Sequence, residues 1–501
     1  MIEGLKPYAE YKESDIPWAR ALPSHWVTKR GKCYMVAIDQ RSKVGKEELL
    51  TVSSARGVVP RNSAKVTMFK AESYAGHKLC WPGDLVINSL WAWGGGLGVT
   101  QHHGIISTAY SVYRPRPSAQ MNPRFLHELV RSSAFHWELQ VRSKGVWISR
   151  LQLTDTSFLD APIPLPPPDE QAAIVRFLDH ANRKIDGFIR VKRKLIGLLN
   201  EQKQAIIHRA VTRGLHPDFH PQISQISAVG NSENLRPSAK SADKNLKPSG
   251  IPWLGDIPKH WEVMQLRQVL SFGPKNGVSP QAASGTGVLS FSISAVRGGR
   301  ITIEGNEKFV ELDSARIAGF RVHKGDILLV RGNGNAALVG KCGLVDACPE
   351  NCVYPDILMK LRPNEKMNAE FMVLAINSSY VTNQVSTLAK TSNGAFKVSG
   401  ATVRSISMVV PPYAEQIRLI GEIGAETATI TTAIARTERE IALMQEYRTR
   451  LTADLVTGKL DVRAAAAKLP EVQSDGAAPS DASEMSDLSD DLEEPSLEEE
   501  P

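Results

Sequence analysis

Two long stretches of the chain place apolar residues at alternating steps of three and four positions. One series runs Val175, Leu178, Asn182, Ile185, Ile189, Lys192, Ile196, Leu199, Lys203, Ile206, Ala210. The other, 245 positions later, runs Ile420, Ile423, Thr427, Ile430, Ile434, Thr437, Ile441, Met444, Arg448, Leu451, Leu455. A mean step of 3.5 residues is typical of a coiled-coil seam. We therefore predict two helices built to one plan, whose apolar seam residues pack on each other. The alternative is two amphipathic helices that each belong to a larger globular core.

Matching start and stop signals flank both stretches. "PPPDEQ" (166–171) and "PPYAEQ" (411–416) precede them, and a proline at the first helical position costs little because its missing N–H needs no partner there. Gly214 and Gly458 follow and are typical helix stops. About 40 residues of helix span roughly 60 Å.

A second repeat lies ahead of each helix. "IPWARALPSHW" (16–26) and "IPWLGDIPKHW" (251–261) agree at six of eleven positions. Each copy of this repeat is separated from its long helix by a mixed segment. Strand-like runs such as 84–88 and 326–330 each follow a glycine, and helical windows at 122–135 and 368–381 occupy similar places in the two segments. These patterns predict mixed α/β units, one in each half of the chain.

The organisation that follows has seven segments. They are an N-terminal extension (1–13), a first globular domain (14–165), a first helix (166–215), a polar linker (216–249), a second globular domain (250–410), a second helix (411–461) and an acidic tail (462–501) that we expect to be disordered.

The net charge of +7 conceals an uneven distribution. Residues 470–501 hold twelve carboxylates and no Lys or Arg, which leaves 60 basic and 41 acidic residues, or +19, on the rest. Such an excess favours a polyanionic partner through counterion release. No run of apolar residues is long enough for a membrane span, and no signal peptide is visible, so we expect a cytoplasmic protein.

Candidate catalytic and metal motifs fail on their spacing. From Gly334 to Gly340 there is one residue too many for a phosphate-binding loop, and Cys342 stands where Ser or Thr would hold magnesium. Cys342, Cys348 and Cys352, with His323 upstream, do not match zinc-ligand spacing. We see neither a catalytic triad nor an amino-methylating tetrapeptide, and predict a non-catalytic chain without a metal site.

Polar and aromatic loop residues of the two basic domains are therefore the candidates for DNA contact. Arg and Asn can pair with guanine and adenine, and Lys holds phosphate. The candidates are Lys43, Arg56, Arg61, Trp91, Trp93, His102, His103 and Lys144 in the first half, and Lys275, Asn276, Arg297, Arg300, Arg331, Asn333, Asn335, Lys390 and Asn393 in the second.

Over residues 14–460 the chain resembles the specificity subunits of type I restriction–modification systems. The resemblance rests on the two repeats together with "LLTVSSARGVVPR" (49–61), "GDLVINSLWAW" (83–93), "GIISTAYSVYRP" (104–115), "GDILLVRGNGN" (325–335) and "YPDILMKLRP" (354–363). The acidic tail departs from the family pattern.

The resemblance implies a fold and a set of partners. The fold would be two target-recognition domains separated by an antiparallel coiled coil with a pseudo-two-fold internal repeat. The partners would be double-stranded DNA, two methyltransferase subunits and two motor–nuclease subunits, with S-adenosylmethionine, ATP and magnesium bound by those partners. An orphan DNA-binding adaptor is the main alternative, and the missing motifs disfavour an autonomous nuclease or methyltransferase.

Overall fold

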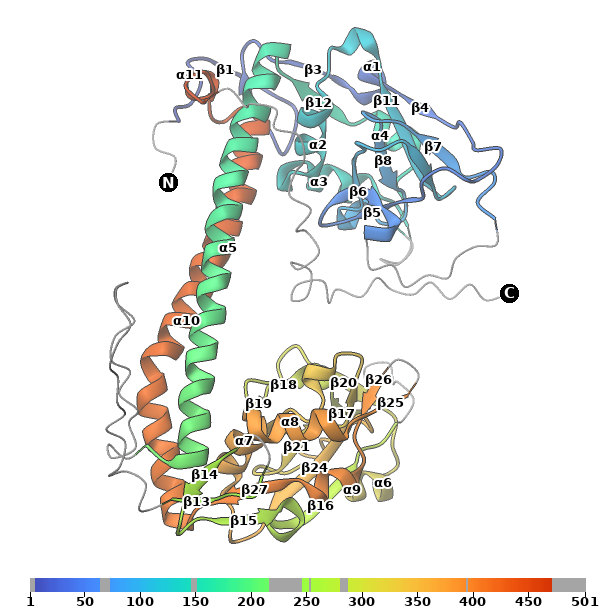
Figure 1. Ribbon diagram of the computed structural model, residues 1–501. Coiled ribbons are helices and arrows are strands. Elements are labelled where there is room, and N and C mark those ends of the chain that lie inside the picture. Colours follow the sequence, from blue (N-terminus) through green and yellow to red (C-terminus); the bar gives the residue numbers. More distant parts are fainter. Residues whose placement is uncertain are drawn as a thin grey trace. The chain divides into compact units, whose positions relative to one another are not determined.

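The computed structural model describes residues 5–63, 73–145, 151–215, 246–251, 254–279, 287–392 and 395–470. The chain divides into two compact units (Figure 1): unit 1 combines Met1–Lys192 with Arg439–Pro501, and unit 2 comprises Arg193–Glu438. Helices α5 (Pro168–Arg213) and α10 (Tyr413–Val456) each contribute to both units. Within the described ranges, no helix is apolar over enough of its length to cross a membrane.

Unit 1 is built on an antiparallel four-stranded sheet with the order β4-β11-β8-β9. Its strands are β1 (Tyr11–Glu13), β2 (Ala21–Pro23), β3 (Val27–Arg30), β4 (Met35–Ile38), β5 (Leu50–Ser53), β6 (Gly57–Pro60), β7 (Lys78–Cys80), β8 (Leu85–Asn88), β9 (Leu97–Val99), β10 (Gly104–Ile106), β11 (Tyr110–Pro115) and β12 (Pro162–Leu165). Its short helices are α1 (Gly31–Tyr34), α2 (Pro123–Arg131), α3 (Ser133–Arg142), α4 (Asp155–Leu159) and α11 (Arg463–Ala467).

Unit 2 contains the corresponding sheet with the order β16-β24-β21-β23, extended by β19 and β18. Its strands are β13 (Leu246–Pro248), β14 (Asp256–Pro258), β15 (Glu262–Gln265), β16 (Leu270–Asn276), β17 (Val288–Phe291), β18 (Val296–Arg297), β19 (Arg300–Ile301), β20 (Glu307–Val310), β21 (Ile327–Val330), β22 (Gly332–Asn333), β23 (Cys342–Leu344), β24 (Leu358–Pro363), β25 (Lys390–Ser392), β26 (Ala395–Lys397) and β27 (Ser407–Val410). Its short helices are α6 (Ser314–Phe320), α7 (Ala369–Asn377), α8 (Ser379–Leu388) and α9 (Gly400–Ser405).

The shared strand order of the central sheets extends the sequence repeat to the fold of the two units. In each unit, a strand that precedes the central sheet in sequence pairs with a strand that follows it. These pairs are β3–β12 in unit 1 and β15–β27 in unit 2. Both predicted strands at 84–88 and 326–330 are confirmed, and the glycines before them, Gly83 and Gly325, have φ of 95° and 89°. Only glycine adopts such values without strain, which explains why a glycine precedes each strand. The predicted mixed helix and sheet content is confirmed.

The two long helices are confirmed, with 46 and 44 residues. Pro168 begins α5, whereas Pro412 lies one residue before α10. Gly214 and Gly458 follow the helix ends with φ of 79° and 72°. All fifteen apolar residues proposed for the seam are buried or partly buried: Val175, Leu178, Ile185, Ile189, Ile196, Leu199, Ile206, Ile420, Ile423, Ile430, Ile434, Ile441, Met444, Leu451 and Leu455.

In unit 1 the beginning of α5 lies against the end of α10. Leu178 of α5 and Leu455 of α10 belong to one buried core. Lys192 Nζ lies 2.7 Å from Glu440 Oε2, and Arg448 forms an ion pair with Asp186. Lys192 and Arg448 are polar members of the predicted seam, so their cross-helix pairs account for two of its polar interruptions.

In unit 2 the end of α5 lies against the beginning of α10. Val211 of α5 and Leu419 of α10 belong to one buried core. Arg209 pairs with Glu426 at 3.0 Å, and Lys203 Nζ donates to Thr431 Oγ1 at 3.0 Å. Within each unit, therefore, early residues of one helix contact late residues of the other.

The two helix-stop glycines offer a matched test. A Cβ at Gly458 would lie 2.5 Å from Pro23 Cδ, whereas the nearest atom to a Cβ at Gly214 is 3.8 Å away, in the Trp261 side chain. Gly214→Ala should cost about 1–2 kcal/mol for the left-handed backbone. Gly458→Ala should cost about 2–4 kcal/mol, because overpacking adds to the backbone term. Chemical denaturation, monitored in each unit by hydrogen exchange, would measure the loss of stability in the two variants. Equal losses would contradict the packing of Gly458 against Pro23.

Three expected boundaries need correction. The tail begins later than residue 462, because Val462 and Ala466 are buried in the core of unit 1 and α11 follows α10 closely. The linker ends earlier than residue 249, because β13 pairs with β14. The N-terminal extension is part of unit 1, because β1 pairs with β2 and Tyr8 is buried. Residues 216–245 and 471–501 lie outside the described residues.

Candidate nucleic-acid interface and its support

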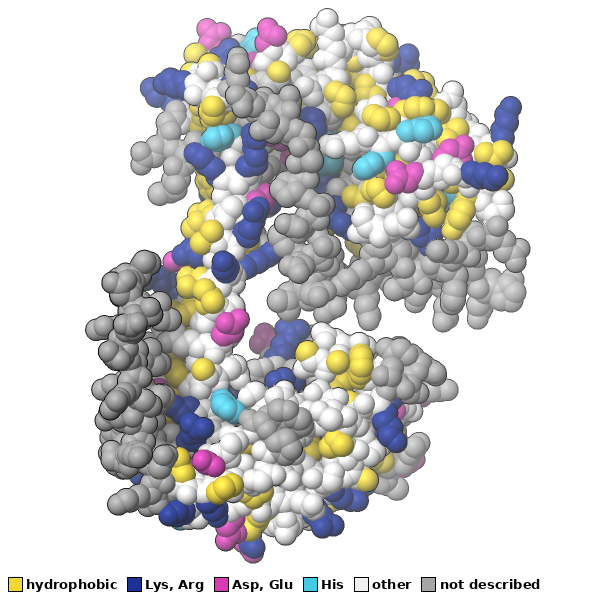
Figure 2. All heavy atoms as spheres, in the orientation of Figure 1, with side chains coloured by type: hydrophobic (Ala, Val, Ile, Leu, Met, Phe, Trp, Pro, Cys, Tyr) yellow, Lys and Arg dark blue, Asp and Glu magenta, His cyan; other side chains and the backbone are white. Residues whose placement is uncertain are grey.

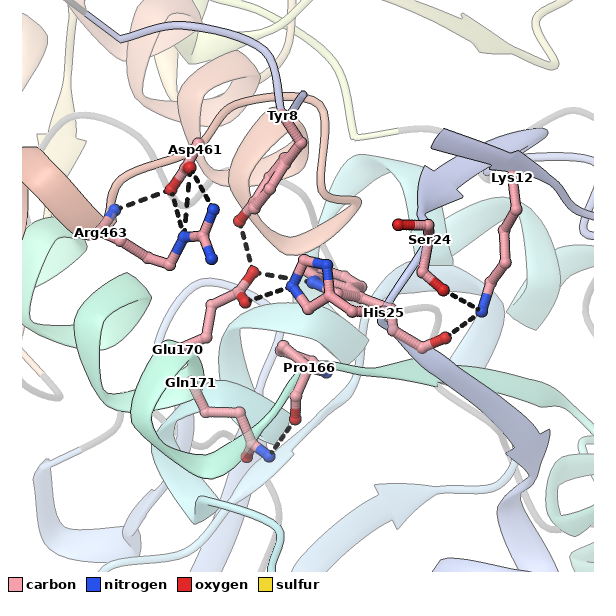
Figure 3. Close-up of polar contacts among 10 residues, drawn as sticks. Tyr8, Lys12, Ser24, His25, Pro166, Glu170, Gln171, Asp461 and Arg463 are labelled. Atoms are coloured by element: carbon pink, nitrogen blue, oxygen red, sulfur yellow. Dashed lines mark hydrogen bonds and ion pairs between the residues drawn. The ribbon is translucent and has the colours of Figure 1, made fainter. Parts of the chain in front are cut away.

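A buried carboxylate at the start of α5 joins the two repeated motifs of the first half (Figure 3). Glu170, from "PPPDEQ", accepts a hydrogen bond from Trp26 Nε1 at 2.7 Å and lies 2.7 Å from His25 Nε2. Tyr8 Oη donates to the same carboxylate at 2.5 Å. Burial, and then the bond to Glu170, raise the pKa of Tyr8, so its hydroxyl stays protonated as a donor. The His-Trp motif thus binds the Glu-Gln motif.

The second half repeats this contact in unit 2. Glu415 accepts from Trp261 Nε1 at 3.1 Å and lies 2.9 Å from His260 Nε2. Its side chain is 17% exposed, against 3% for Glu170, and Arg418 pairs with it at 3.2 Å. The chemistry is the same, but the second carboxylate is more hydrated.

The glutamine that follows each glutamate fixes the opposite side of the helix start. Gln171 accepts from Asn122 N at 2.7 Å and donates to the carbonyl of Pro166 at 2.9 Å. Gln416 accepts from Asn368 N at 2.8 Å and donates to the carbonyl of Pro411 at 2.9 Å. Asn122 and Asn368 in turn cap α2 and α7. Each Glu-Gln pair therefore anchors a long helix to its own globular domain by buried and partly buried hydrogen bonds. We call this arrangement the helix socket.

The helix sockets were missed as contacts in the sequence, although both motifs were visible. Trp26 and Glu170 are 144 residues apart, and Trp261 and Glu415 are 154 apart. The available signal was that both motifs recur in the same order at nearly the same offset. A buried carboxylate needs hydrogen-bond donors, and the indole N–H of the recurring tryptophan is one.

The DNA-contact candidates of unit 1 fall into two groups along the β5–β6 hairpin. At its turn, Arg56 is exposed, and Trp91 Nε1 donates to Ser54 Oγ at 3.1 Å. Trp91 and Trp93 are partly buried, with ring centroids 4.6 Å apart. At the base of the hairpin, Arg61 N donates to the carbonyl of Leu49. The neighbouring Glu48 carboxylate oxygen Oε2 lies 4.0 Å from His102 Nδ1.

The other candidates of unit 1 are separate from these groups. Lys43 and Lys144 are exposed on connections, and His103 Nδ1 lies 3.2 Å from the carbonyl of Cys80.

The candidates of unit 2 differ in how far neighbouring groups already engage them. Arg297 is exposed, whereas Arg300 pairs with Asp346 at 2.5 Å and with Glu370 at 3.1 Å. Lys275 Nζ donates to the carbonyl of Gly319 and lies over the ring of Phe320. Two carboxylates neutralise Arg300, which makes it a weaker phosphate ligand than Arg297.

The remaining candidates of unit 2 lie mainly around a small sheet of β22, β26 and β25. Arg331 and Asn333 are partly buried there, and Asn335 and Lys390 are exposed. Asn276 is exposed at the end of β16. Asn393 lies outside the described residues.

The cysteines considered for a metal site belong to apolar cores. Cys342 lies in one buried cluster of unit 2 and Cys352 in another, and burial raises the pKa of Cys352 to about 12. Thiols in such surroundings resist the deprotonation that a metal requires. Among the described residues, no group of three His, Cys, Asp or Glu side chains is placed to hold a metal ion.

A partly buried histidine supports the first candidate group and should make unit 1 sensitive to acid. His127 Nδ1 accepts from Val99 N at 3.2 Å, and burial, followed by Arg131 and Arg124, lowers its pKa to about 4. The unfolded chain binds the extra proton near pH 6.5. The stability that neutral His127 contributes to unit 1 should therefore be fully present above pH 6.5 and be lost progressively between pH 6.5 and about 4.

Denaturant titrations at several pH values would check this, with His127→Val as the control because Val373 occupies the equivalent place in unit 2. Identical pH slopes for the two proteins would argue against a role for His127.

Comparison with known proteins places this architecture. The chain is 25% identical to the EcoKI specificity subunit of a type I restriction enzyme from Escherichia coli over 383 residues, 72% of this chain and 74% of the relative. It is 22% identical over 383 residues to the StySPI specificity subunit from Salmonella potsdam, 72% of this chain and 73% of that relative. The chain is therefore similar over about three quarters of its length to specificity subunits of type I restriction enzymes. No protein-family model matches it.

A solved structure has a similar fold. A chain from a study of complex assembly and conformational transition of the type I R-M system aligns with a TM-score of 0.52 at 16% identity. The alignment covers 88% of this chain and 99% of that chain. At this identity the similarity concerns the fold alone, and it covers 88% of this chain, against 72% for each sequence alignment.

Proposed function

We propose that this chain is the DNA specificity subunit of a type I restriction–modification complex. Two target-recognition domains, 14–165 and 250–410, would each recognise one half of a bipartite, asymmetric DNA target. The observation that carries the proposal is the duplicated helix socket, because it attaches two divergent domains with the same strand order to one pair of helices in the same way. DNA presents its two strands in a two-fold-related manner, and a duplicated chain supplies two related readers.

The helices would form an antiparallel coiled coil that separates the recognition domains. This proposal is supported by the antiparallel contacts inside each unit and by the burial of the seam residues. Helices are stiff, so their length would set the distance between the two half-sites.

The outward side of α5 is the proposed docking surface for the methyltransferase subunits. Four large apolar side chains are exposed on it: Phe188, Val191, Leu195 and Leu198. Figure 2 shows hydrophobic side chains among Lys and Arg on the long helices. Such a surface suits a protein partner, because an exposed apolar stripe rimmed by charge is typical of an interaction site. We propose two methyltransferase and two restriction subunits as partners, which would bind S-adenosylmethionine, ATP and magnesium, and a non-catalytic role for this chain.

The experiment that tests the function is single-molecule methylation profiling of the source genome with the gene intact and deleted. We expect a split motif with methyladenine on both strands to disappear on deletion. Persistence of every methylated motif, together with failure of the chain to co-purify with a methyltransferase, would instead favour an orphan adaptor.

A further inference from the structure

Two short turns at equivalent places in the two units each carry an exposed arginine. The first is "SARG" (54–57), between β5 and β6, and the second is "SAVRGG" (294–299), which contains β18 and the turn before β19. Arg56 and Arg297 are the arginines. The sequences differ by inserted residues, so the correspondence rests on what each turn contacts.

Each turn ends on a glycine that packs against the same place on a supporting helix. Gly57 has a φ of 73°, and a Cβ there would lie 3.0 Å from His127 Cε1 of α2. Gly299 has a φ of 81°, and a Cβ there would lie 3.3 Å from Val373 Cγ1 of α7. His127 and Val373 are 246 positions apart, the offset that also relates the helix caps Asn122 and Asn368.

A second residue of each helix fixes the strand beside the turn. Arg131 Nη1 donates to the carbonyl of Leu97 at 2.6 Å, and Asn377, again 246 positions later, donates to the carbonyl of Cys342 at 2.9 Å. Leu97 and Cys342 begin β9 and β23.

The backbone of each turn is also held directly. Arg131 Nη2 donates to the carbonyls of Ser54 at 2.6 Å and Ala55 at 2.9 Å. In unit 2, Leu344 N donates to the carbonyl of Gly299 at 3.0 Å. Both arginines therefore project from backbone that is fixed before any ligand binds, which lowers the entropy cost of a contact.

The two guanidinium groups retain their charge for a partner. Arg56 Nη2 donates to the carbonyl of Ser63 at 2.7 Å, and Arg297 Nε donates to the carbonyl of Ser294 at 3.0 Å. Within the described ranges, neither has a carboxylate partner, in contrast to Arg300. A guanidinium has five N–H donors in a planar fork that matches two oxygens of a phosphate.

We propose that Arg56 and Arg297 are equivalent phosphate contacts, one for each half-site, and this inference rests on the proposed function. The two domains have diverged and would recognise different bases, yet they keep this arginine on the same support. A feature common to two readers of different sequences suits the part of DNA that both half-sites share, its phosphodiester backbone. Phosphate contacts position a protein without selecting bases. Arg131 and Asn377 are then positioning residues for the turns.

The test is DNA binding by the full chain to two duplexes of about 30 base pairs, measured by fluorescence anisotropy between about 50 and 200 mM salt. One duplex carries the methylated motif and the other a scrambled sequence. Arg56→Ala and Arg297→Ala should each weaken binding to both duplexes by a similar factor and reduce the slope of log K against log salt by about 0.9. Arg56→Lys and Arg297→Lys should restore the slope, because a lysine keeps the charge. Arg116→Ala and Arg404→Ala, exposed arginines outside the turns, are the matched controls.

The outcomes separate this inference from the function on which it rests. Unchanged slopes in both alanine variants, or weakening confined to the motif duplex, would overturn the phosphate assignment. The second result would make these arginines base contacts, and a lysine, which lacks the planar fork of a guanidinium, would then restore binding poorly. If the wild-type chain binds neither duplex and no methylation motif depends on the gene, the proposed function itself is wrong.

Discussion

Replacing Glu170 with alanine should lower the free energy of unfolding of unit 1 by about 3–5 kcal/mol, the range observed when one partner of a buried charged contact is removed. The loss would leave the buried Trp26 indole N–H and the Tyr8 hydroxyl without their acceptor, and each unsatisfied buried donor costs about 1–3 kcal/mol. Trp26 is 0% exposed and Tyr8 5% exposed, so water replaces the carboxylate poorly at both.

The second helix socket supplies the control for this prediction. Glu415→Ala removes the same pair of contacts, to His260 and Trp261, from a site where the glutamate side chain is 17% exposed. Water can reach that site, so we expect a smaller loss of about 1–2 kcal/mol, confined to unit 2. Hydrogen exchange measured peptide by peptide would separate the units. Equal losses in both would show that burial and Tyr8 add nothing at Glu170.

A conservative variant separates charge from shape. Glu170→Gln keeps an oxygen that accepts from Trp26 and places an amide beside His25, whose tautomer can adapt to it. We expect most of the stability to return. If the glutamine variant is as unstable as the alanine variant, the negative charge itself is required.

The sequence predicted those features that depend on local periodicity. The long helices follow from apolar steps of three and four, and the stop glycines Gly214 and Gly458 follow from the positive φ that ends a helix. The strands at β8 and β21 follow from short apolar runs after a turn glycine. Each of these signals lies within one segment, so one segment was enough to find it.

Features that join distant segments were not predictable in the same way. Arg300 was a reasonable DNA candidate until the fold brought Asp346 and Glu370, 46 and 70 residues later, to its guanidinium. Arg56 and Arg297 were both candidates, but their equivalence depends on His127 and Val373, on helices that precede neither turn. Residue type alone cannot rank such residues as DNA contacts. Whether a guanidinium is available to DNA depends on partners that other elements supply.

Inserting one heptad after Lys192 in α5 and one after Glu438 in α10 should change the DNA target while both half-sites keep their bases. These points coincide with the division between the units. The pairs Lys192–Glu440 and Arg448–Asp186 of unit 1 and Arg209–Glu426 of unit 2 would therefore remain intact. Seven residues are close to two helical turns, so the apolar seam stays in phase.

If the helices set the spacing as we propose, the insertion adds about 10 Å, because a helix rises 1.5 Å per residue. That length corresponds to about three base pairs of B-form DNA at 3.4 Å each. Methylation profiling of cells with the double insertion should show loss of the original motif and a new motif with the same half-sites and a longer spacer. The control adds seven residues after Leu215, outside both helices, and should leave the motif unchanged. An unchanged spacer in the double-insertion variant, or altered half-site bases, would refute the helices as the element that measures the target.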